Sequence, residues 1–411
     1  MASIALYLLM SAGLVSAQVY KLDTNDDIIA SAKTLAYDLM SYYHGNESGQ
    51  TPGILPGPPP AGPYYWWEAG ALWGTMIDYW HLTGDDTYND VITQAMLWQV
   101  GPNRNYMPPN VTASLGNDDQ GFWGMSAMLA AEENFPNPPD DQPQWLALAQ
   151  AVWNTQADPD RHDATCGGGL RWQIPFANNG VGFMDADYNI YDGAHVETNC
   201  TDINRVQYSY NNGVFLLGAA YMYNFTGDAK WQDRVNGLVN ATFRVFFPND
   251  TAYEIGCEHG MTCTTDMLSY KGYVHRWMAT MTKVAPFTAD TILPVLQKSA
   301  QAAVSQCTGG TNGRTCGFQW SSGVFDGSVG AGQTMDVLAA VSSLLIDQTQ
   351  APVTNSDGGT SVGDPNAGVG SGSIDDDPTP ITTGDRAGAG ILTVVVILTA
   401  GAAFGWMGTG R

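Results

Sequence analysis

Residues 66–86 read WWEAGALWGTMIDYWHLTGDD, and this stretch decides the fold. Its first part, Trp66–Leu82, is apolar on nearly every side at helical spacing, which predicts a helix that is buried all round. Thr83 and Gly84 should end that helix, since glycine readily adopts the conformation found at helix C-termini. The next segment, Thr87–Gln99, is amphipathic and predicts a helix with one solvent-exposed face. A buried helix followed by an amphipathic one indicates an inner and an outer layer of helices.

The same pairing recurs along the chain as a weak internal repeat. A second Thr-Gly-Asp step, Thr226–Asp228, follows another apolar segment and precedes another amphipathic one. The predicted helices are Asp26–Tyr43, Trp66–Leu82, Thr87–Gln99, Asp118–Glu132, Gln144–Gln156, Tyr210–Tyr223, Trp231–Phe246, Ser269–Met281, Ala289–Val304 and Thr334–Ile346.

These segments predict an all-α fold, an (α/α)6 toroid of inner and outer helices joined by Gly-rich loops. About ten helices are predicted, short of the twelve of a six-hairpin ring. The missing ones would lie in Asp158–Asn204. That stretch is rich in Gly and Asn, however, and is typical of loops with short hairpins.

The two ends of the chain carry processing signals. Residues 1–17 resemble a secretory signal peptide, and residues 18–346 form the expected catalytic domain. Residues 347–386 are rich in Ser, Thr, Gly, Pro and Asp, so we expect a disordered linker. The apolar tail at 387–411 completes a GPI-attachment signal with a site near Ser371, and the tail would be removed. A retained transmembrane helix is the alternative. The signals predict export to the outer face of the plasma membrane or the cell wall, held by a lipid anchor.

The charge of the chain restricts its partners. With 16 Lys plus Arg against 40 Asp plus Glu, the net charge is −24. Such a surface repels nucleic acid and anionic lipid. We expect a monomer that binds no nucleic acid.

Six cysteines follow the signal peptide, and an even number in a secreted protein indicates disulfides. Short loops favour Cys257–Cys263 and Cys307–Cys316, which leaves Cys166–Cys200. A zinc site is the alternative, but no C-x-x-C spacing exists, so no metal or other cofactor is predicted. Six N-glycosylation sequons agree with secretion: Asn46, Asn110, Asn199, Asn224, Asn240 and Asn249.

Candidate chemistry centres on Asp118 and Asp119. Paired Asp also occurs at 26–27, 85–86, 140–141 and within 375–377, and Asp at a helix start is by default a cap. Only the pair at 118–119 opens a buried helix beside Gly, Phe and Trp residues. In a partly desolvated pocket two adjacent carboxyls cannot easily both ionise, so one can serve as an acid and the other as a nucleophile. Their adjacency suits the short separation of retaining glycosidases.

Aromatic and amide side chains gather at the other predicted inner-helix starts. Aromatic faces stack on sugar rings, and amides bond sugar hydroxyls, although ordinary core packing would account for most of these aromatics. The candidates for the groove are Trp67, Asn117, Trp123, Tyr210 and Asn211.

Several motifs together resemble glycoside hydrolase family 76. They are WEAG at 67–70, NDDQ at 117–120, CGGGLRW at 166–172, YNNG at 210–213 and YKG at 270–272. The resemblance implies an (α/α)6 fold and a retaining mechanism, with Asp118 as nucleophile and Asp119 as general acid/base. It also implies that the subsites are lined by Gly168, Gly169, Trp172, Tyr210, Asn211 and Lys271.

The resemblance extends to the fungal branch of that family, the GPI-anchored mannan endo-1,6-α-mannosidases of cell-wall assembly. It implies an α-mannan or GPI-anchor glycan as donor, with wall β-glucan as an acceptor for transglycosylation. A non-catalytic mannan-binding wall protein on the same scaffold is the alternative.

Overall fold

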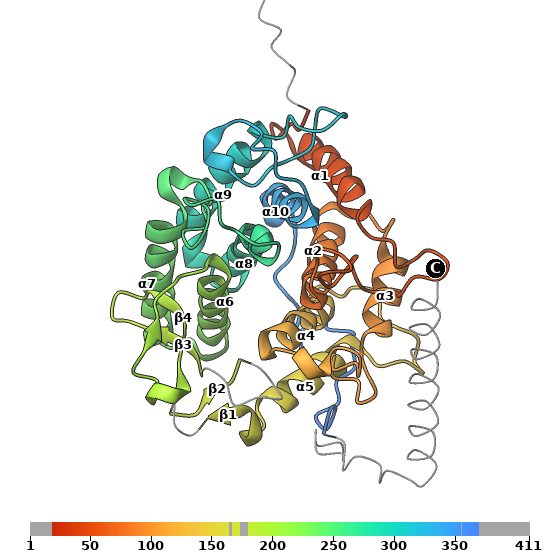
Figure 1. Ribbon diagram of the computed structural model, residues 1–411, viewed down its shortest axis with the longest axis vertical. Helices are drawn as coiled ribbons and strands as arrows, with labels where there is room; N and C mark the ends of the chain where they lie inside the picture. Colours follow the sequence, from red (N-terminus) through yellow and green to blue (C-terminus); the bar gives the residue numbers. More distant parts are fainter. Residues whose placement is uncertain (1–18, 164–166, 173–179, 355, 370–411) are drawn as a thin grey trace, which may run out of the picture. The chain divides into compact units, whose positions relative to one another are not determined.

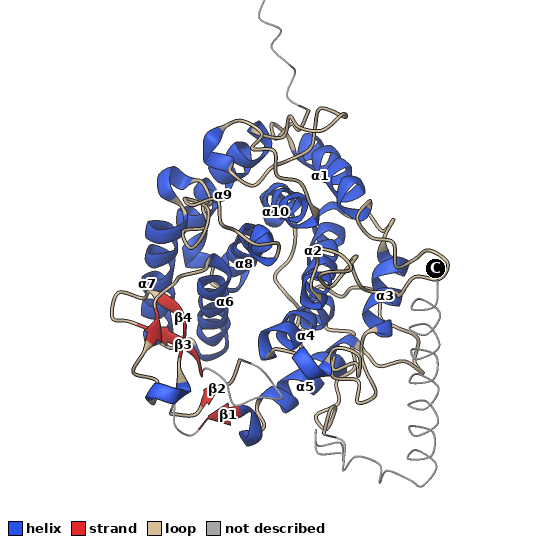
Figure 2. Cartoon of the chain, viewed as in Figure 1, coloured by secondary structure: helices blue, strands red, loops and turns tan. Residues whose placement is uncertain are grey.

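The structure is a computed structural model that describes residues 19–163, 167–172, 180–354 and 356–369. Helices dominate the described residues, and short strands gather in one region (Figure 2). The α-helices are α1 (Asn25–Met40), α2 (Trp66–Thr83), α3 (Asn89–Trp98), α4 (Asn117–Glu132), α5 (Trp145–Gln156), α6 (Ser209–Thr226), α7 (Ala229–Phe246), α8 (Tyr270–Val284), α9 (Ala289–Ser305) and α10 (Ala331–Ser342).

The helices alternate between two layers around one centre (Figure 1). The inner layer holds α2, α4, α6, α8 and α10, and the outer layer holds α1, α3, α5, α7 and α9. Almost every residue of α2, α8 and α10 is buried, because each of these helices contacts protein on all sides. The toroid and the predicted helices are confirmed.

The ends of the helices follow local sequence rules. α2 stops at Gly84, whose φ of 70° is left-handed, and α6 stops at Gly227 with φ 64°. At the start of α2, the Tyr65 N–H donates to Glu68 Oε2 at 2.6 Å. This bond satisfies one of the free amide groups of the first turn.

The stretch 158–204 forms small sheets where extra helices would have completed the ring. β1 (His162–Asp163) pairs with β2 (Gly169–Leu170), and β3 (Gly180–Met184), β4 (Ile190–Ala194) and β5 (Ile203–Asn204) form an antiparallel sheet. The described residues therefore hold ten α-helices and not twelve. Glycine destabilises helix interiors, so this Gly- and Asn-rich stretch favours tight hairpins.

Residues 353–368, of which 355 is not described, form a strap that continues the domain past α10. Val353 N–H donates to Glu132 O at 2.8 Å, at the end of α4. The strap then runs along α5: Leu146 N–H donates to Ser361 Oγ at 2.9 Å, and Asn154 Nδ2 donates to Ala367 O at 2.9 Å. Within the predicted linker, residues 347–354 and 356–369 are described and make these contacts, and the rest of the range lies outside the described residues. The side-chain amides of Gln150 and Asn154 on α5 hydrogen-bond to the backbone of the strap.

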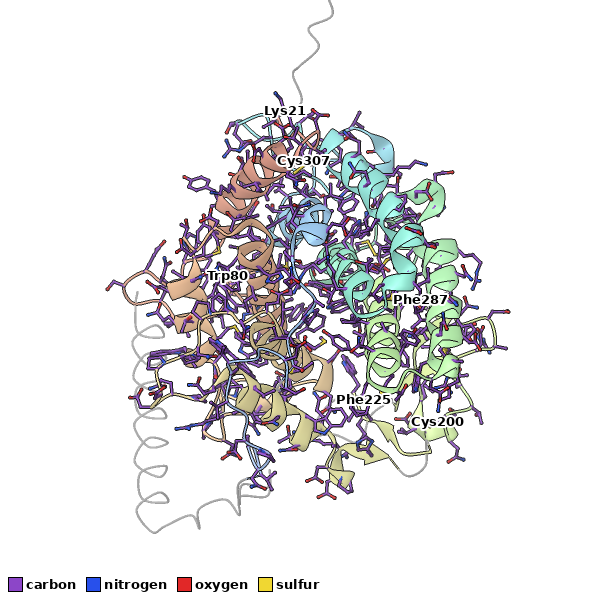
Figure 3. All side chains as sticks on the ribbon, turned by 180° about the vertical axis from the view of Figure 1, so that it is seen from behind. Lys21, Trp80, Cys200, Phe225, Phe287 and Cys307 are labelled. Carbon is purple, nitrogen blue, oxygen red and sulfur yellow. A yellow bond between two sulfur atoms is a disulfide. The ribbon has the colours of Figure 1, made fainter. Side chains whose placement is uncertain are left out.

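Two disulfides are confirmed. Cys257–Cys263 closes a short loop before α8, and Cys307–Cys316 closes the loop after α9, near the label Cys307 in Figure 3. The third predicted pair, Cys166–Cys200, lies outside the described residues because Cys166 is not among them.

The predicted signal peptide and most of the tail with its attachment site also lie outside the described residues. Within the described ranges, no helix is long and apolar enough to cross a membrane. Contacts divide the chain after Gly368, so every described helix and strand belongs to the first unit.

Candidate active site

Asp118 and Asp119 lie in the first turn of α4, on the inner layer. The Asp119 side chain closes back on the helix start, since Gly116 N–H donates to Asp119 Oδ2 at 2.8 Å. The Asp119 N–H donates to Asp118 Oδ1 at 3.1 Å. Negative side chains are favoured at this end of a helix, where the backbone N–H groups point outward. Local helix physics therefore holds both carboxyls at one edge of the toroid.

The two carboxyls share a desolvated environment. Burial and then the charge of Asp119 raise the pKa of Asp118 to about 7, although hydrogen bonds from the Asp119 N–H and from Trp172 act to lower it. Burial likewise raises the pKa of Asp119 to about 6, against the lowering effect of the Gly116 N–H. The pair titrates as a unit and holds one proton in mildly acidic solution.

Gly116 provides the space that the carboxyls occupy. A Cβ at this position would lie 2.3 Å from Asp118 Oδ1 and 3.3 Å from Asp119 Oδ2. The φ of Gly116 is −83°, so other residues could adopt its backbone conformation. The requirement for glycine here is therefore steric.

A loop after β2 places Trp172 over the pair. Asn117 holds this loop, because its N–H donates to Trp172 O at 2.7 Å and its Nδ2 donates to Arg171 O at 2.6 Å. Arg161 Nη1 donates in turn to Asn117 Oδ1 at 2.6 Å. Asn117 is buried with its amide engaged by protein, so it positions the loop. Trp172 leaves 50 % of its surface exposed beside Asp118.

Aromatic rings pack behind the carboxyls. Phe122 lies one turn into α4, with its ring 4.6 Å from that of Trp67 and 6.2 Å from that of Tyr210. Tyr210 packs against Tyr270 at 4.4 Å between ring centroids. Burial and the charge of Asp118 raise the pKa of Tyr210, which puts its hydroxyl group in the field of the pair. The starts of α2, α4, α6 and α8 thus converge on one site.

The remaining predicted site residues divide by exposure. Gly168 is exposed at the β1–β2 turn with φ 85°, and Gly169 pairs with Asp163 in the β1–β2 ladder. Asn211 is partly buried next to Tyr210. Trp67 is almost fully buried, and its ring packs against that of Phe122.

Two predicted groove residues point elsewhere. Trp123 is fully buried, stacked on Trp66 at 4.9 Å. Lys271 is also fully buried, and its Nζ contacts Glu258 Oε2 at 2.8 Å and donates to Phe318 O at 2.6 Å. Neither side chain has free surface to offer a sugar.

Two acidic residues near the site, Asp192 and Asp266, escaped the sequence reasoning, and Glu68 entered it only as a member of the WEAG motif. Asp266 raises the pKa of Asp119 through its charge, and Asp192 acts in the same way on Tyr210. Burial raises the pKa of Glu68 to about 8, and its Oε1 is buried without a hydrogen-bond partner. Glu68 had a local signal in its capping position, whereas no local pattern marked Asp192 or Asp266.

Residues 27–186 and 178–356 match the pattern of the family described as glycosyl hydrolase family 76. The chain belongs to glycosyl hydrolase family 76.

Relatives of family 76 cover nearly the whole chain. Mannan endo-1,6-alpha-mannosidase DCW1 of Saccharomyces cerevisiae is 39 % identical over 94 % of this chain and 94 % of its own length. The crystal structure of Dfg5 from Chaetomium thermophilum in complex with glucosamine is similar, with a TM-score of 0.84 and 55 % identity over 86 % of this chain and 98 % of that one. The GH76A α-1,6-mannanase of Salegentibacter sp. HEL1_6 shares the fold at 14 % identity, with a TM-score of 0.60 over 78 % of this chain and 99 % of that one.

Proposed function

We propose that this family 76 protein is a retaining glycosidase or transglycosidase that acts on α-1,6-linked mannose. One observation carries the chemistry: two adjacent, partly buried carboxyls with raised pKa values open α4 beneath a half-exposed Trp172. The substrate follows from the relatives, which align with this chain over nearly their full length and are named mannan endo-1,6-alpha-mannosidases.

The hydrogen bonds support Asp118 as nucleophile and Asp119 as general acid/base. Asp118 receives three donors, the Asp119 N–H, its own N–H and the Trp172 side chain, and donors stabilise the ionised form. Asp119 receives the Gly116 N–H on Oδ2, which leaves Oδ1 available to hold a proton. The pKa of Asp118 is the higher of the two, about 7 against about 6, so the bound substrate must help to set where the shared proton resides.

The retaining reaction then proceeds in two steps. Asp118 attacks the anomeric carbon while Asp119 protonates the oxygen of the departing sugar, which gives a covalent mannosyl–enzyme. Asp119 next removes a proton from water or from a sugar hydroxyl, and that oxygen displaces Asp118. Hydrolysis and transfer differ only in the acceptor.

The exposed face of Trp172 and the hydroxyl of Tyr210 suit the apolar face and the hydroxyls of a mannose ring. Trp67 and Phe122 support that surface from behind. Asn117, with its amide engaged, acts through the loop that it holds and makes no sugar contact in this proposal.

We further propose that the donor is α-mannan or a GPI-anchor glycan and that wall β-glucan is an acceptor. The signal peptide, the GPI-attachment pattern and the sequons support a glycosylated, lipid-anchored protein at the cell surface. All six sequon asparagines are exposed, which is compatible with glycosylation.

The test is to incubate the protein with α-1,6-mannan oligosaccharides, with and without a β-glucan acceptor, and to follow the products by mass spectrometry. Hydrolysis gives shorter mannosides, and transfer gives mannosyl-glucan. Asp118→Asn and Asp119→Asn should each lower the rate by about a thousandfold or more. Binding of mannan by the wild type without any cleavage or transfer would favour the non-catalytic wall protein.

A further inference from the structure

A cavity of about 360 Å³ lies inside the ring, lined by residues of α2, α4, α6 and α8 (Figure 1). Within the described part of the chain, α4 packs on α2 and α6 packs on α8, whereas α4 and α6 are not a closely packed pair. The small sheets of 158–204 stand where a helical hairpin would have come between them. The missing helices therefore leave space in the interior, and its volume is within the range of small-ligand sites, about 300–1,000 Å³.

This cavity is distinct from the catalytic site. Its lining on α4 begins at Phe122 and ends at Glu132, and neither Asp118 nor Asp119 belongs to it. With a rise of about 1.5 Å per residue, Glu132 lies roughly 21 Å along α4 from Asp118. The polar end of the cavity and the catalytic carboxyls are thus at opposite ends of the same helix.

Most of the lining is apolar. Phe122 and Trp277 stack on each other with ring centroids 6.3 Å apart, at the end nearer the catalytic pair. Met125 and Met128 come from α4, and Leu217 comes from α6. Methionine side chains are flexible and adapt to irregular shapes. Met128 leaves 37 % of its surface exposed, so this part of the lining can be reached from solvent.

Polar side chains gather at the far end of the cavity, and one of them is a carboxyl without a cation. Arg276 is already engaged, since its Nε donates to Asp78 Oδ2 and its Nη1 donates to Thr75 Oγ1 at 3.3 Å. Among the described residues, the Glu132 carboxyl receives only the Tyr221 hydroxyl, at 2.8 Å on Oε2. Burial raises the pKa of Glu132 to about 7. Its other oxygen, Oε1, is left to accept from a donor that enters the cavity.

We propose that this cavity binds a primary amine carried on an unbranched alkyl chain. The chain packs among Phe122, Met128 and Leu217, and the ammonium group donates to Glu132 Oε1. Charge selects the head group, because an alcohol leaves the Glu132 charge uncompensated and a carboxylate is repelled by it. Length selects the shape, because Phe122 and Glu132 are about 15 Å apart along α4 and only an elongated molecule reaches both. The site does not depend on the proposed function.

The test is isothermal titration calorimetry on the full mature chain at pH 8, where Glu132 is ionised, with n-octylamine, n-octanol and octanoate as probes. A hydrogen bond to a charged group strengthens binding roughly ten- to a hundredfold, so octylamine should bind at least tenfold more tightly than octanol. Octanoate should bind more weakly than octanol. Equal affinities for octylamine and octanol, or no binding of octylamine at millimolar concentration, would overturn the proposal.

Glu132→Gln tests the head group, because glutamine keeps the shape of the side chain and can still accept the Tyr221 hydroxyl. It should weaken octylamine binding at least tenfold while octanol binding and the melting temperature stay unchanged. Glu133→Gln is the matched control, since Glu133 is the next residue but does not line the cavity. That variant should change octylamine binding less than threefold. Equal losses in the two variants would mean that overall charge is responsible, and the assignment of Glu132 would fall.

Two further variants locate the bound probe. Leu217→Trp fills part of the cavity and should weaken the binding of both octylamine and octanol. Asp118→Asn should leave octylamine binding unchanged, because the catalytic pair lies at the other end of α4. If Asp118→Asn weakens octylamine binding and Leu217→Trp does not, the amine binds at the catalytic pair and the cavity is not its site.

Discussion

Replacing Gly116 with alanine should disable the active site without disturbing the fold. The added Cβ would lie 2.3 Å from Asp118 Oδ1, whereas ordinary contact begins near 3.4 Å, so the carboxyl must move by about 1 Å. The obstructed atom is the end of a side chain, which can yield at little cost to stability. A misplacement of about 1 Å at a reacting group lowers the rate roughly a hundredfold, or about 2.7 kcal/mol in the barrier. We expect kcat on α-1,6-mannotetraose to fall by about that factor.

Stability should hardly change, because the backbone of Gly116 suits alanine. The loss of a helix cap and the reduced freedom of the unfolded chain oppose each other, each at about 1 kcal/mol or less. Gly121→Ala is the matched control, since its Cβ would meet only Gln156 Nε2 at 3.6 Å. That variant should keep its activity and gain up to about 1 kcal/mol. If Gly116→Ala retains a third or more of the wild-type kcat, or if it unfolds, the steric explanation is wrong.

Three further outcomes can be measured. The pKa of Asp118 is raised from 3.8 to about 7 in the folded state, so protonation of this carboxyl stabilises the protein fully below about pH 3.8, and that stabilisation is lost as the pH rises through 7. Asp118→Asn should therefore match the wild-type melting temperature at pH 4 and exceed it at pH 7. An unchanged difference in melting temperature across that range would contradict the raised pKa. The Asp78–Arg276 ion pair is buried between α2 and α8, so Arg276→Met should lower the free energy of unfolding in urea by about 3–5 kcal/mol. Adding Asp78→Leu should restore most of that stability, because it removes the unpaired carboxylate. Equal instability of the single and double variants would show that the unpaired charge of Asp78 is not the cause. The Cys307–Cys316 disulfide closes a loop with a sequence separation of 9. Replacing both cysteines with serine should lower the free energy of unfolding by roughly 2–3 kcal/mol, measured by calorimetry. No change would show that the loop is ordered without the disulfide.

The sequence was sufficient where structure is decided within a few residues. The period of Trp66–Leu82 and the left-handed Gly84 are local, so the helix and its end were predictable. The same holds for Asp118 and Asp119, whose position in a first turn follows from the buried helix that they open.

Side-chain direction was less predictable, because successive helical residues point about 100° apart. Tyr270 packs against Tyr210, whereas Lys271, one residue later, reaches the loop that contains Phe318. Trp123 turns into the core beside Phe122 for the same reason. A motif at a helix start therefore indicates a site without telling which of its members reach it.

Long-range partners lay beyond local reasoning altogether. The charge of Asp192 acts on Tyr210 only because β4 packs against α6. The strap has the composition of a linker, and its order depends on amides such as Asn154 that stand far away in sequence. No periodicity in either segment records these contacts.

The direction of the strap decides where the polypeptide leaves the domain. It starts at the C-terminal end of α4, far from the aspartates, and climbs α5 until Ala367 and Gly368 meet Asn154 and Ala151. At the end of α5, Gln156 Nε2 donates to Asn117 O at 2.7 Å, and Asn117 is the first residue of α4. The last residues of the first unit thus lie beside the C-terminal part of α5, at the same end of the toroid as the start of α4. If a lipid anchor follows these residues closely in the sequence, as proposed, the enzyme is held by the end that carries Asp118 and Asp119, and glycans rooted in the same membrane are the substrates that it meets first.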